Sequence, residues 1–168
     1  MWKSRIVSEG VEAPDQLLAN PGNYRIHPKT QQTALQASLA NIGWVQRILV
    51  NQNTGHVVDG HARIELAISN GETEVPVTYL DLTEQEEKLI LATYDPISAM
   101  AVNDKEVLSG LLDDIETDSE ALQEMLSKLA EEEGIIPPDF LPVDESEQPR
   151  LDEKKKTCCP KCGHEFEA

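Results

Sequence analysis

The apolar residues follow two spacings that separate the expected strands from the expected helices. Short β-rich apolar runs between turn residues predict strands at 47–50, 56–59 and 75–80. Apolar residues three and four positions apart, as at Ala34, Leu35, Leu39 and Ile42, predict helices. The expected helices span 30–43, 62–69, 83–94, 103–115 and 118–134. Residues 1–22 are expected to form a short strand, a brief helical turn and a loop.

Turn and capping residues give the ends of these elements. Residues 53–55, Asn-Thr-Gly, predict a hairpin turn between the first two strands. Thr30 is the expected N-cap of the first helix, and Thr83 with Glu86 predicts a capping box at 83–94, a helix that Pro96 is expected to end. Asn103 with Glu106 predicts a second capping box in the same way.

The order of elements predicts an α+β fold, a small mixed β-sheet flanked by helices. This domain is expected to cover residues 1–100, followed by acidic helices over 101–134. Residues 135–156 are rich in Pro, Glu, Asp and Lys and are expected to be a disordered linker. Residues 157–168 form a cysteine-containing tail.

Net charge argues against direct binding of duplex DNA. The chain of 168 residues carries a formal charge of −17, of which residues 101–168 hold −12, from 7 basic and 19 acidic residues. Proteins bind DNA by placing Lys and Arg against phosphates, so a strongly acidic surface repels that partner. The region 103–133 is also short and acidic and lacks a basic recognition helix.

The most informative segment is Val57-Val58-Asp59-Gly60-His61-Ala62-Arg63, where a strand meets a helix at a glycine. Glycine lets the backbone approach a ligand closely, and the free N–H groups of the first helical turn attract anions. Arg63 lies in that turn and can place its guanidinium on a phosphate or carboxylate. The segment predicts an anion site, although the same pattern also occurs at ordinary strand–helix junctions with a solvated arginine.

Several motifs in one order give a resemblance to a known superfamily. The motifs are Asn20-Pro21 with Tyr24-Arg25, residues 43–50 (Gly-Trp-Val-Gln-Arg-Ile-Leu-Val), the hairpin, Asp59 to Arg63, Val75-Pro76-Val77 and a Leu-Thr-Glu helix start. This order, over about residues 15–100, resembles the nucleotide-binding domain of the ParB and sulfiredoxin superfamily. It is most similar to the ParB-like domains of phages and mobile elements, some of which are associated with DNA methyltransferases.

The resemblance implies a nucleotide site and names its residues. Gly60, His61 and Arg63 are expected to hold phosphates of CTP or ATP, with Mg²⁺ as a companion ion. Arg25 and His27 lie in the loop that approaches the nucleotide in relatives, or are ordinary surface residues. Gln46 is a further ligand contact or only a turn residue, and Asp59 orients the site or caps the following helix. Asp95 is the carboxylate expected to serve the metal.

Four departures from the family patterns narrow the expected function. His61 stands where sulfiredoxin has its cysteine, so repair of sulfinic acids through a thiol is excluded. Ala62 replaces the first arginine of the ParB box. CTP-binding ParB proteins hold magnesium with a Glu-Asn pair on a helix, whereas residues 91–96 here read Leu-Ala-Thr-Tyr-Asp-Pro. ParB proteins also continue into a DNA-reading domain where this chain has the acidic region 103–133.

The cysteines near the C-terminus suggest metal or reduced thiols. Cys159 and Cys162 are two residues apart, the spacing that grips one zinc ion, and His164 is the expected third ligand. Cys158 is a further thiol whose position next to Cys159 makes joint chelation awkward. The set is half of a zinc knuckle, to be completed by a partner or a second copy, or else it is a vestigial ribbon with free thiols.

These observations predict a nucleotide-binding switch, with or without NTP hydrolysis, that serves DNA modification, partition or packaging in a phage or mobile element. The alternative is an adaptor that kept the fold and binds a protein partner through its acidic helices. A nuclease is the least favoured of the three, because no cluster of carboxylates surrounds the site. The N-terminus lacks the apolar run of a signal peptide, so the expected location is the cytoplasm, and pairing of the acidic helices would give a homodimer.

Overall fold

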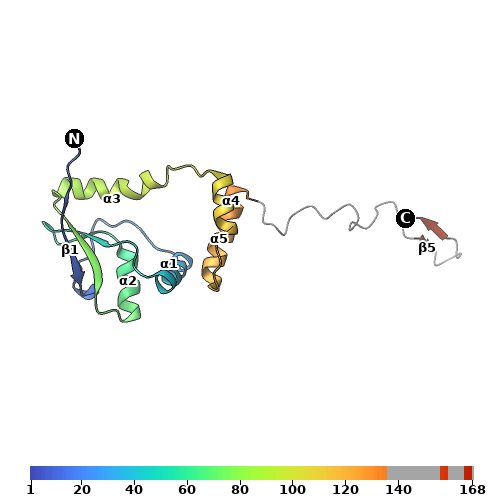
Figure 1. Cartoon of the computed structure of the whole chain (residues 1–168), viewed down its shortest axis with the longest axis horizontal. Helices are drawn as coiled ribbons and strands as arrows, with labels where there is room; N and C mark the ends of the chain where they lie inside the picture. The colour runs from blue at the N-terminus through green and yellow to red at the C-terminus, as the bar shows by residue number, and fades with distance from the viewer. Residues whose placement is uncertain (136–155, 159–164, 168) are drawn as a thin grey trace.

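The chain folds around a four-stranded mixed sheet whose strand order is β1-β4-β2-β3 (Figure 1). The structure is a computed structural model that describes residues 1–135, 156–158 and 165–167. The strands are β1 (Ile6–Glu12), β2 (Ile48–Asn51), β3 (Val57–Asp59) and β4 (Val75–Leu80). Strand β4 pairs antiparallel with β1 and parallel with β2, and β2 pairs antiparallel with β3. The expectation of an α+β fold with a small mixed sheet is confirmed.

The helices lie around this sheet and extend beyond it. They are the 3-10 turn η1 (Pro14–Gln16), α1 (Lys29–Ile42), α2 (His61–Asn70), α3 (Glu84–Ser98), α4 (Lys105–Asp113) and α5 (Glu120–Glu133). Helices α4 and α5 form a two-helix unit to one side of the sheet, where α5 packs against α1 (Figure 1). Two short strands, β5 (Lys156–Cys158) and β6 (Glu165–Glu167), pair with each other.

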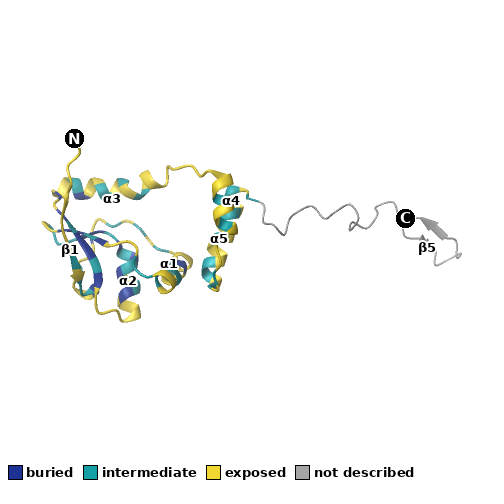
Figure 2. Cartoon of the chain, in the orientation of Figure 1, coloured by how far each residue is buried: buried dark blue, intermediate teal, exposed yellow. Residues whose placement is uncertain are grey.

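The core has one apolar cluster on each face of the sheet. One cluster combines Val50, Val57 and Val77 of the sheet with Ile64 and Ala67 of α2. The smaller cluster consists of Val58, Leu80 and Leu82, with Ile90 of α3 packed against it. The sheet and α2 therefore carry most of the buried residues, whereas α4 and α5 have none (Figure 2).

Three expected helix ends are wrong. The N-cap of α1 is Pro28 and not Thr30, because the extended Pro28 (ψ 152°) accepts the first helical hydrogen bond, from the N–H of Gln32 at 3.0 Å. Helix α3 runs through Pro96 to Ser98, and the carbonyl that the proline leaves free belongs to the exposed Ala92, where water can bond it.

The third error concerns the start of α4. Asp104, not Asn103, is its N-cap, and the Asp104 carboxylate accepts a hydrogen bond from the backbone N–H of Val107 at 3.1 Å. The Asn103 amide instead donates to Glu133 Oε1 at 2.7 Å, which ties the start of α4 to the end of α5. The capping box of Thr83 and Glu86, by contrast, is confirmed.

At Gly60 both the backbone conformation and the packing restrict which residue can occupy the position. Its φ of +104° lies in the left-handed region, and an added Cβ would meet Ile48 Cδ1 at 2.5 Å. Ile48 is fully buried in the centre of the sheet and cannot move aside easily. Only glycine therefore fits between the end of β3 and the start of α2.

We expect Gly60→Ala to lower the free energy of unfolding by about 2–4 kcal/mol, since it adds both backbone strain and overpacking. Gly71→Ala is the matched control: its φ is +75°, but an added Cβ has no atom within 4 Å. The control should lose only about 1 kcal/mol in urea unfolding followed by circular dichroism. Equal losses in the two variants would contradict the close packing against Ile48.

Candidate functional site

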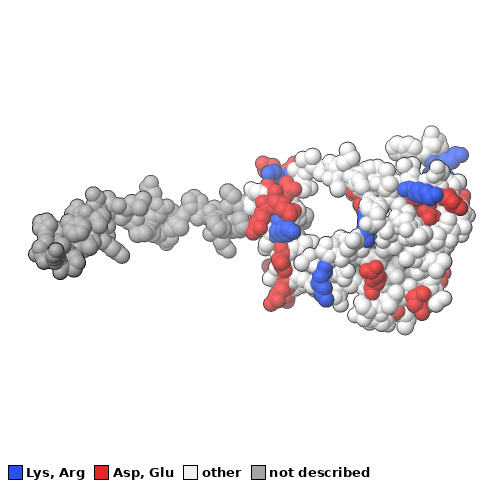
Figure 3. Space-filling model, turned by 180° about the vertical axis from the view of Figure 1, so that it is seen from behind, with Lys and Arg blue, Asp and Glu red and all other residues white. Residues whose placement is uncertain are grey.

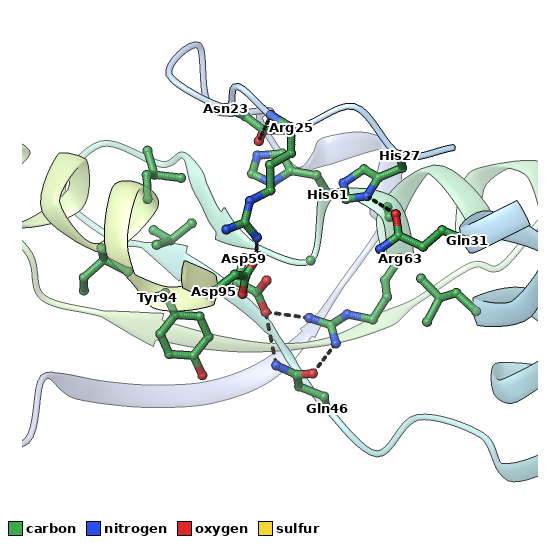
Figure 4. A pocket seen from close by; sticks show the side chains of 16 residues that line it. Asn23, Arg25, His27, Gln31, Gln46, Asp59, His61, Arg63, Tyr94 and Asp95 are labelled. Atoms are coloured by element: carbon green, nitrogen blue, oxygen red, sulfur yellow. Dashed lines mark hydrogen bonds and ion pairs between the residues drawn. The ribbon is translucent and has the colours of Figure 1, made fainter. Parts of the chain in front are cut away.

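A polar pocket of about 200 Å³ lies where the loop before α1, the end of β3, the start of α2 and the face of α3 come together (Figure 4). It has an apolar side formed by Leu35, Val58, Ile90 and Leu91. All seven residues predicted to hold the nucleotide or its metal line this pocket: Arg25, Gln46, Asp59, Gly60, His61, Arg63 and Asp95.

Arg63 is held in place by two hydrogen-bond acceptors. Its Nη2 donates to Asp59 Oδ2 and its Nη1 donates to Gln46 Oε1, both at 2.6 Å, and Gln46 Nε2 closes the triangle by donating to Asp59 Oδ2 at 3.2 Å (Figure 4). The Arg63 side chain is only 12% exposed. Within the described residues its Nε is buried without a hydrogen-bond partner. The two bonds use one N–H on each terminal nitrogen, so Nη1 and Nη2 each keep a second N–H donor.

The start of α2 offers backbone donors at the same place. The N-cap is Gly60, and no side chain caps the first turn. The first intrahelical bond runs from the N–H of Ile64 to the carbonyl of Gly60, which leaves the preceding N–H groups of the turn without an intrahelical acceptor. Because the helix dipole adds a partial positive charge there, this end of the pocket favours an anion.

A second arginine crosses the pocket from the opposite side. Arg25 comes from the loop before α1 and forms an ion pair with Asp95 of α3. Its guanidinium also lies 5.6 Å from the ring centre of Tyr24. The pocket thus contains two guanidinium groups and two carboxylates, so its formal charge is balanced before any ligand binds.

His61 connects the pocket to the loop before α1. Its Nε2 accepts a hydrogen bond from the backbone N–H of Asn20 at 3.3 Å, so the ring hydrogen of the neutral form lies on Nδ1. Burial lowers the pKa of His61 below its ordinary 6.5, although the nearby Asp59 carboxylate opposes the shift. His61 is therefore a neutral donor at pH 7 and becomes a cation only in more acidic solution.

A buried carboxylate fixes the position of this loop. Glu87 of α3 is 6% exposed and accepts hydrogen bonds from Asn20 Nδ2 at 2.7 Å and from Asn51 Nδ2 and Thr54 Oγ1 at 2.6 Å. The ring of His56 lies 3.6 Å away. Burial alone would raise the pKa of Glu87, but the hydrogen bonds from Thr54, Asn51 and Asn20 outweigh it, so the pKa is lowered.

The sequence did not reveal every part of this arrangement. Pocket residues outside the predicted set include Asn23, Gln31 and Tyr94. Glu87 was also missed, since a glutamate in the first turn of a helix ordinarily faces water. The one available signal for Glu87 was the group of Asn and Thr residues in the turns that meet it.

No metal site is evident in the described part of the chain, where no three His, Cys, Asp or Glu side chains are grouped to hold an ion. The proposed zinc ligands Cys159, Cys162 and His164 lie outside the described residues, and of Cys158 only the backbone in β5 is described. Among the described helices, none is both long and apolar enough to cross a membrane.

Comparison with solved structures shows a ParB-like fold. The chain is similar to the C-terminally truncated chromosome-partitioning protein ParB from Caulobacter crescentus complexed with CTP-gamma-S, with a TM-score of 0.50 and 22% identity. The match covers 64% of this chain and 62% of that one, so the chain spans less than two thirds of that protein's length. A pNOB8-like ParB N-domain covers 99% of this chain and 56% of its own, at 14% identity and a TM-score of 0.47.

No protein-family model matches the sequence, and no curated protein matches it. The shared feature is thus the fold, and the chemistry of the pocket has to be argued from this chain's own residues.

We expect Glu87→Gln to lower the free energy of unfolding at pH 7 by about 2–4 kcal/mol, because its amide N–H₂ would face side-chain donors. Because folding lowers the pKa of Glu87, its ionised carboxylate stabilises the fold fully above the ordinary pKa of 4.5. This stabilisation is lost as the pH falls through the lowered pKa of the folded state. Urea unfolding between pH 7 and pH 3 should show a shallower loss of stability in the variant. Glu84→Gln, at an exposed position of the same helical turn, should change stability by less than about 0.5 kcal/mol.

We expect the imidazole of His61 to titrate below 6.5 in a proton–nitrogen NMR experiment, and the backbone N–H signal of Asn20 to shift at the same midpoint. Protonation of Nε2 removes the acceptor for that N–H. His61 therefore stabilises the fold fully above pH 6.5, and this contribution is lost as the pH falls through its lowered pKa. A midpoint at or above 6.5 would contradict the buried, hydrogen-bonded ring.

Proposed function

We propose that this chain binds a nucleoside triphosphate, with phosphate groups at the start of α2. The observation that carries the proposal is the convergence of uncapped backbone N–H groups at Gly60 with the guanidinium groups of Arg63 and Arg25 in one pocket. Backbone donors at a helix start and a forked guanidinium are the two groups that proteins most often place on phosphate. The fold of the Caulobacter ParB, whose structure contains CTP-gamma-S, is consistent with such a ligand.

The balanced charge of the pocket sets a condition on binding. Asp59 is hydrogen-bonded to Arg63, and Asp95 is paired with Arg25, so an incoming phosphate has to compete with both carboxylates. Arg25 is the easier of the two to release, since its pair with Asp95 is more exposed than the pair of Arg63 with Asp59. Arg63 is the fixed phosphate contact, and Arg25 is the one that changes partner when the nucleotide binds.

A divalent cation would reduce the repulsion between the phosphates and the two carboxylates of the pocket. Mg²⁺ is commonly held by one or two carboxylates together with phosphate oxygens and water. Asp95 and Asp59 are the carboxylates that would face such an ion, and once released by its arginine, Asp95 becomes free to do so. The ion would neutralise part of the phosphate charge.

The apolar side of the pocket suits the sugar and base. Ile90, Leu91 and Tyr94 lie on one face of α3, and Tyr94 is 47% exposed. An exposed aromatic ring gives a nucleobase a surface for stacking. The volume of about 200 Å³ is less than a whole triphosphate needs, so the base would lie partly in solvent against this ring.

Two further points rest on the sequence resemblance and stay predictions. One is hydrolysis of the nucleotide, and the other is a role in DNA modification, partition or packaging in a phage or mobile element. Zinc at the C-terminal cysteines rests on their spacing and also stays a prediction. Release of inorganic phosphate from the bound nucleotide would test the first of these directly.

We expect calorimetric titration to detect micromolar binding of CTP, ATP or GTP with Mg²⁺, and Arg63→Ala to weaken it by about 100-fold, since a charged hydrogen-bonded contact contributes about 1.5–3 kcal/mol. Arg25→Ala should weaken binding less, by about tenfold, because release from Asp95 offsets part of its contact. Arg5→Ala is the matched control: it removes the same charge at a site paired with Glu86, outside the pocket.

No heat with any of the three nucleotides would reject the proposal. If Arg5→Ala weakened nucleotide binding as much as Arg63→Ala, the loss would reflect the overall charge of the chain and not a contact in the pocket. Circular dichroism of each variant separates loss of the ligand site from loss of the fold.

A further inference from the structure

The two-helix unit of α4 and α5 has an incomplete core. Neither helix contains a buried residue, although both are amphipathic and together span 23 residues. Its contacts are few: Asn103 and Lys105 bond to Glu133, and α5 lies against α1. Helices in water depend mainly on burial of an apolar face for their stability, so a surface that stays open on both helices is available to a partner.

An apolar groove runs between the two helices. Its volume is about 750 Å³. Apolar side chains of both helices, of the connection between them and of the segment after α5 line it: Leu112, Ile115, Leu126, Ala130 and Ile135. This groove is separate from the proposed nucleotide pocket and shares no residue with it. The inference below does not depend on nucleotide binding.

The rim of the groove is acidic. Asp113, Glu116, Asp118 and Glu131 line it, and none of the described lysines or arginines does. Residues 104–133 contain eleven acidic and two basic residues, a net charge of −9 that is more than half of the −17 of the chain. Both lysines have internal partners, because Lys128 lies 3.8 Å from Glu132 and Lys105 donates to the carbonyl of Glu133. Figure 3 shows this crowding of acidic side chains on the two-helix unit.

We propose that this groove binds an amphipathic basic helix of a partner protein. The apolar lining would take the apolar side chains of such a helix, and the acidic rim would face its lysines and arginines. Charge also decides against the other occupants. A second copy of the unit would bring another −9 against the first. Duplex DNA and an anionic membrane carry the wrong sign as well.

The experiment uses the full chain and a fluorescent peptide of about 18 residues, or five turns, in which Leu and Lys are spaced to form an amphipathic helix. Fluorescence anisotropy should give a dissociation constant of about 10 µM at low salt. The same residues in a scrambled order, which breaks the apolar face, should bind at least about tenfold more weakly. A Leu/Glu peptide of the same pattern should not bind.

Two triple variants locate the binding surface. Asp113→Asn, Glu116→Gln and Asp118→Asn together should weaken binding about tenfold, since each exposed ion pair adds little by itself. Asp15→Asn, Glu72→Gln and Glu74→Gln remove the same charge from exposed positions in the main domain and should leave binding within about twofold. Leu126→Ser should weaken binding while keeping every charge, with circular dichroism to confirm that the helices remain.

Equal binding of the ordered and scrambled peptides, or equal weakening by the two triple variants, would reduce the interaction to general charge attraction and overturn the proposal. Sedimentation that shows the chain as a dimer broken by Leu126→Ser would assign the groove to a second copy instead.

Discussion

The arrangement of the site depends on one buried carboxylate. Glu87 enters from α3 and accepts hydrogen bonds from Asn20, Asn51 and Thr54, three residues that belong to two separate turns. A charge at this depth is stable only when its oxygens are fully bonded, so the three partners are held to one geometry. Through them Glu87 fixes the hairpin after β2 and the loop that leads to Arg25. Helix α3, the hairpin after β2 and the loop before α1 are thus joined by polar contacts.

The hydrogen bonds of Glu87 also connect it to the start of α2, the end of the pocket where we propose that phosphate binds. Asn20 bonds to Glu87 with its side chain and to His61 with its backbone N–H, so a single residue connects the buried carboxylate to the first turn of α2. Gly60 completes the junction, because only a residue without Cβ allows Ile48 and the start of α2 to lie so close. Positioning of the groups that we propose to bind phosphate therefore follows from the same packing that closes the sheet. A substitution at Glu87 would therefore disturb the site without touching a ligand.

The sequence predicted the fold and the membership of the pocket better than its internal bonds. Gly60, His61 and Arg63 are adjacent in the sequence, and the family resemblance brought in Arg25, Gln46 and Asp95 from distant segments. The pairing of Arg63 with Asp59 and Gln46, and of Arg25 with Asp95, could not be foreseen, since it depends on side-chain directions across three elements. Glu87 was missed for a similar reason: its burial results from tertiary packing that overrides the ordinary preference of a glutamate for water.

The overall charge of the chain conceals two different electrostatic environments. The net −17 argues against binding of duplex DNA, yet the pocket itself is balanced, with two arginines against two aspartates. More than half of the negative charge lies on residues 104–133, around a groove that shares no residue with the pocket. Salt screens exposed charges over about 10 Å, so the acidic helices affect the encounter with a charged ligand more than the contacts inside the pocket. The proposed anion site on the sheet domain is therefore compatible with a cation-attracting surface on the helical extension of the same chain.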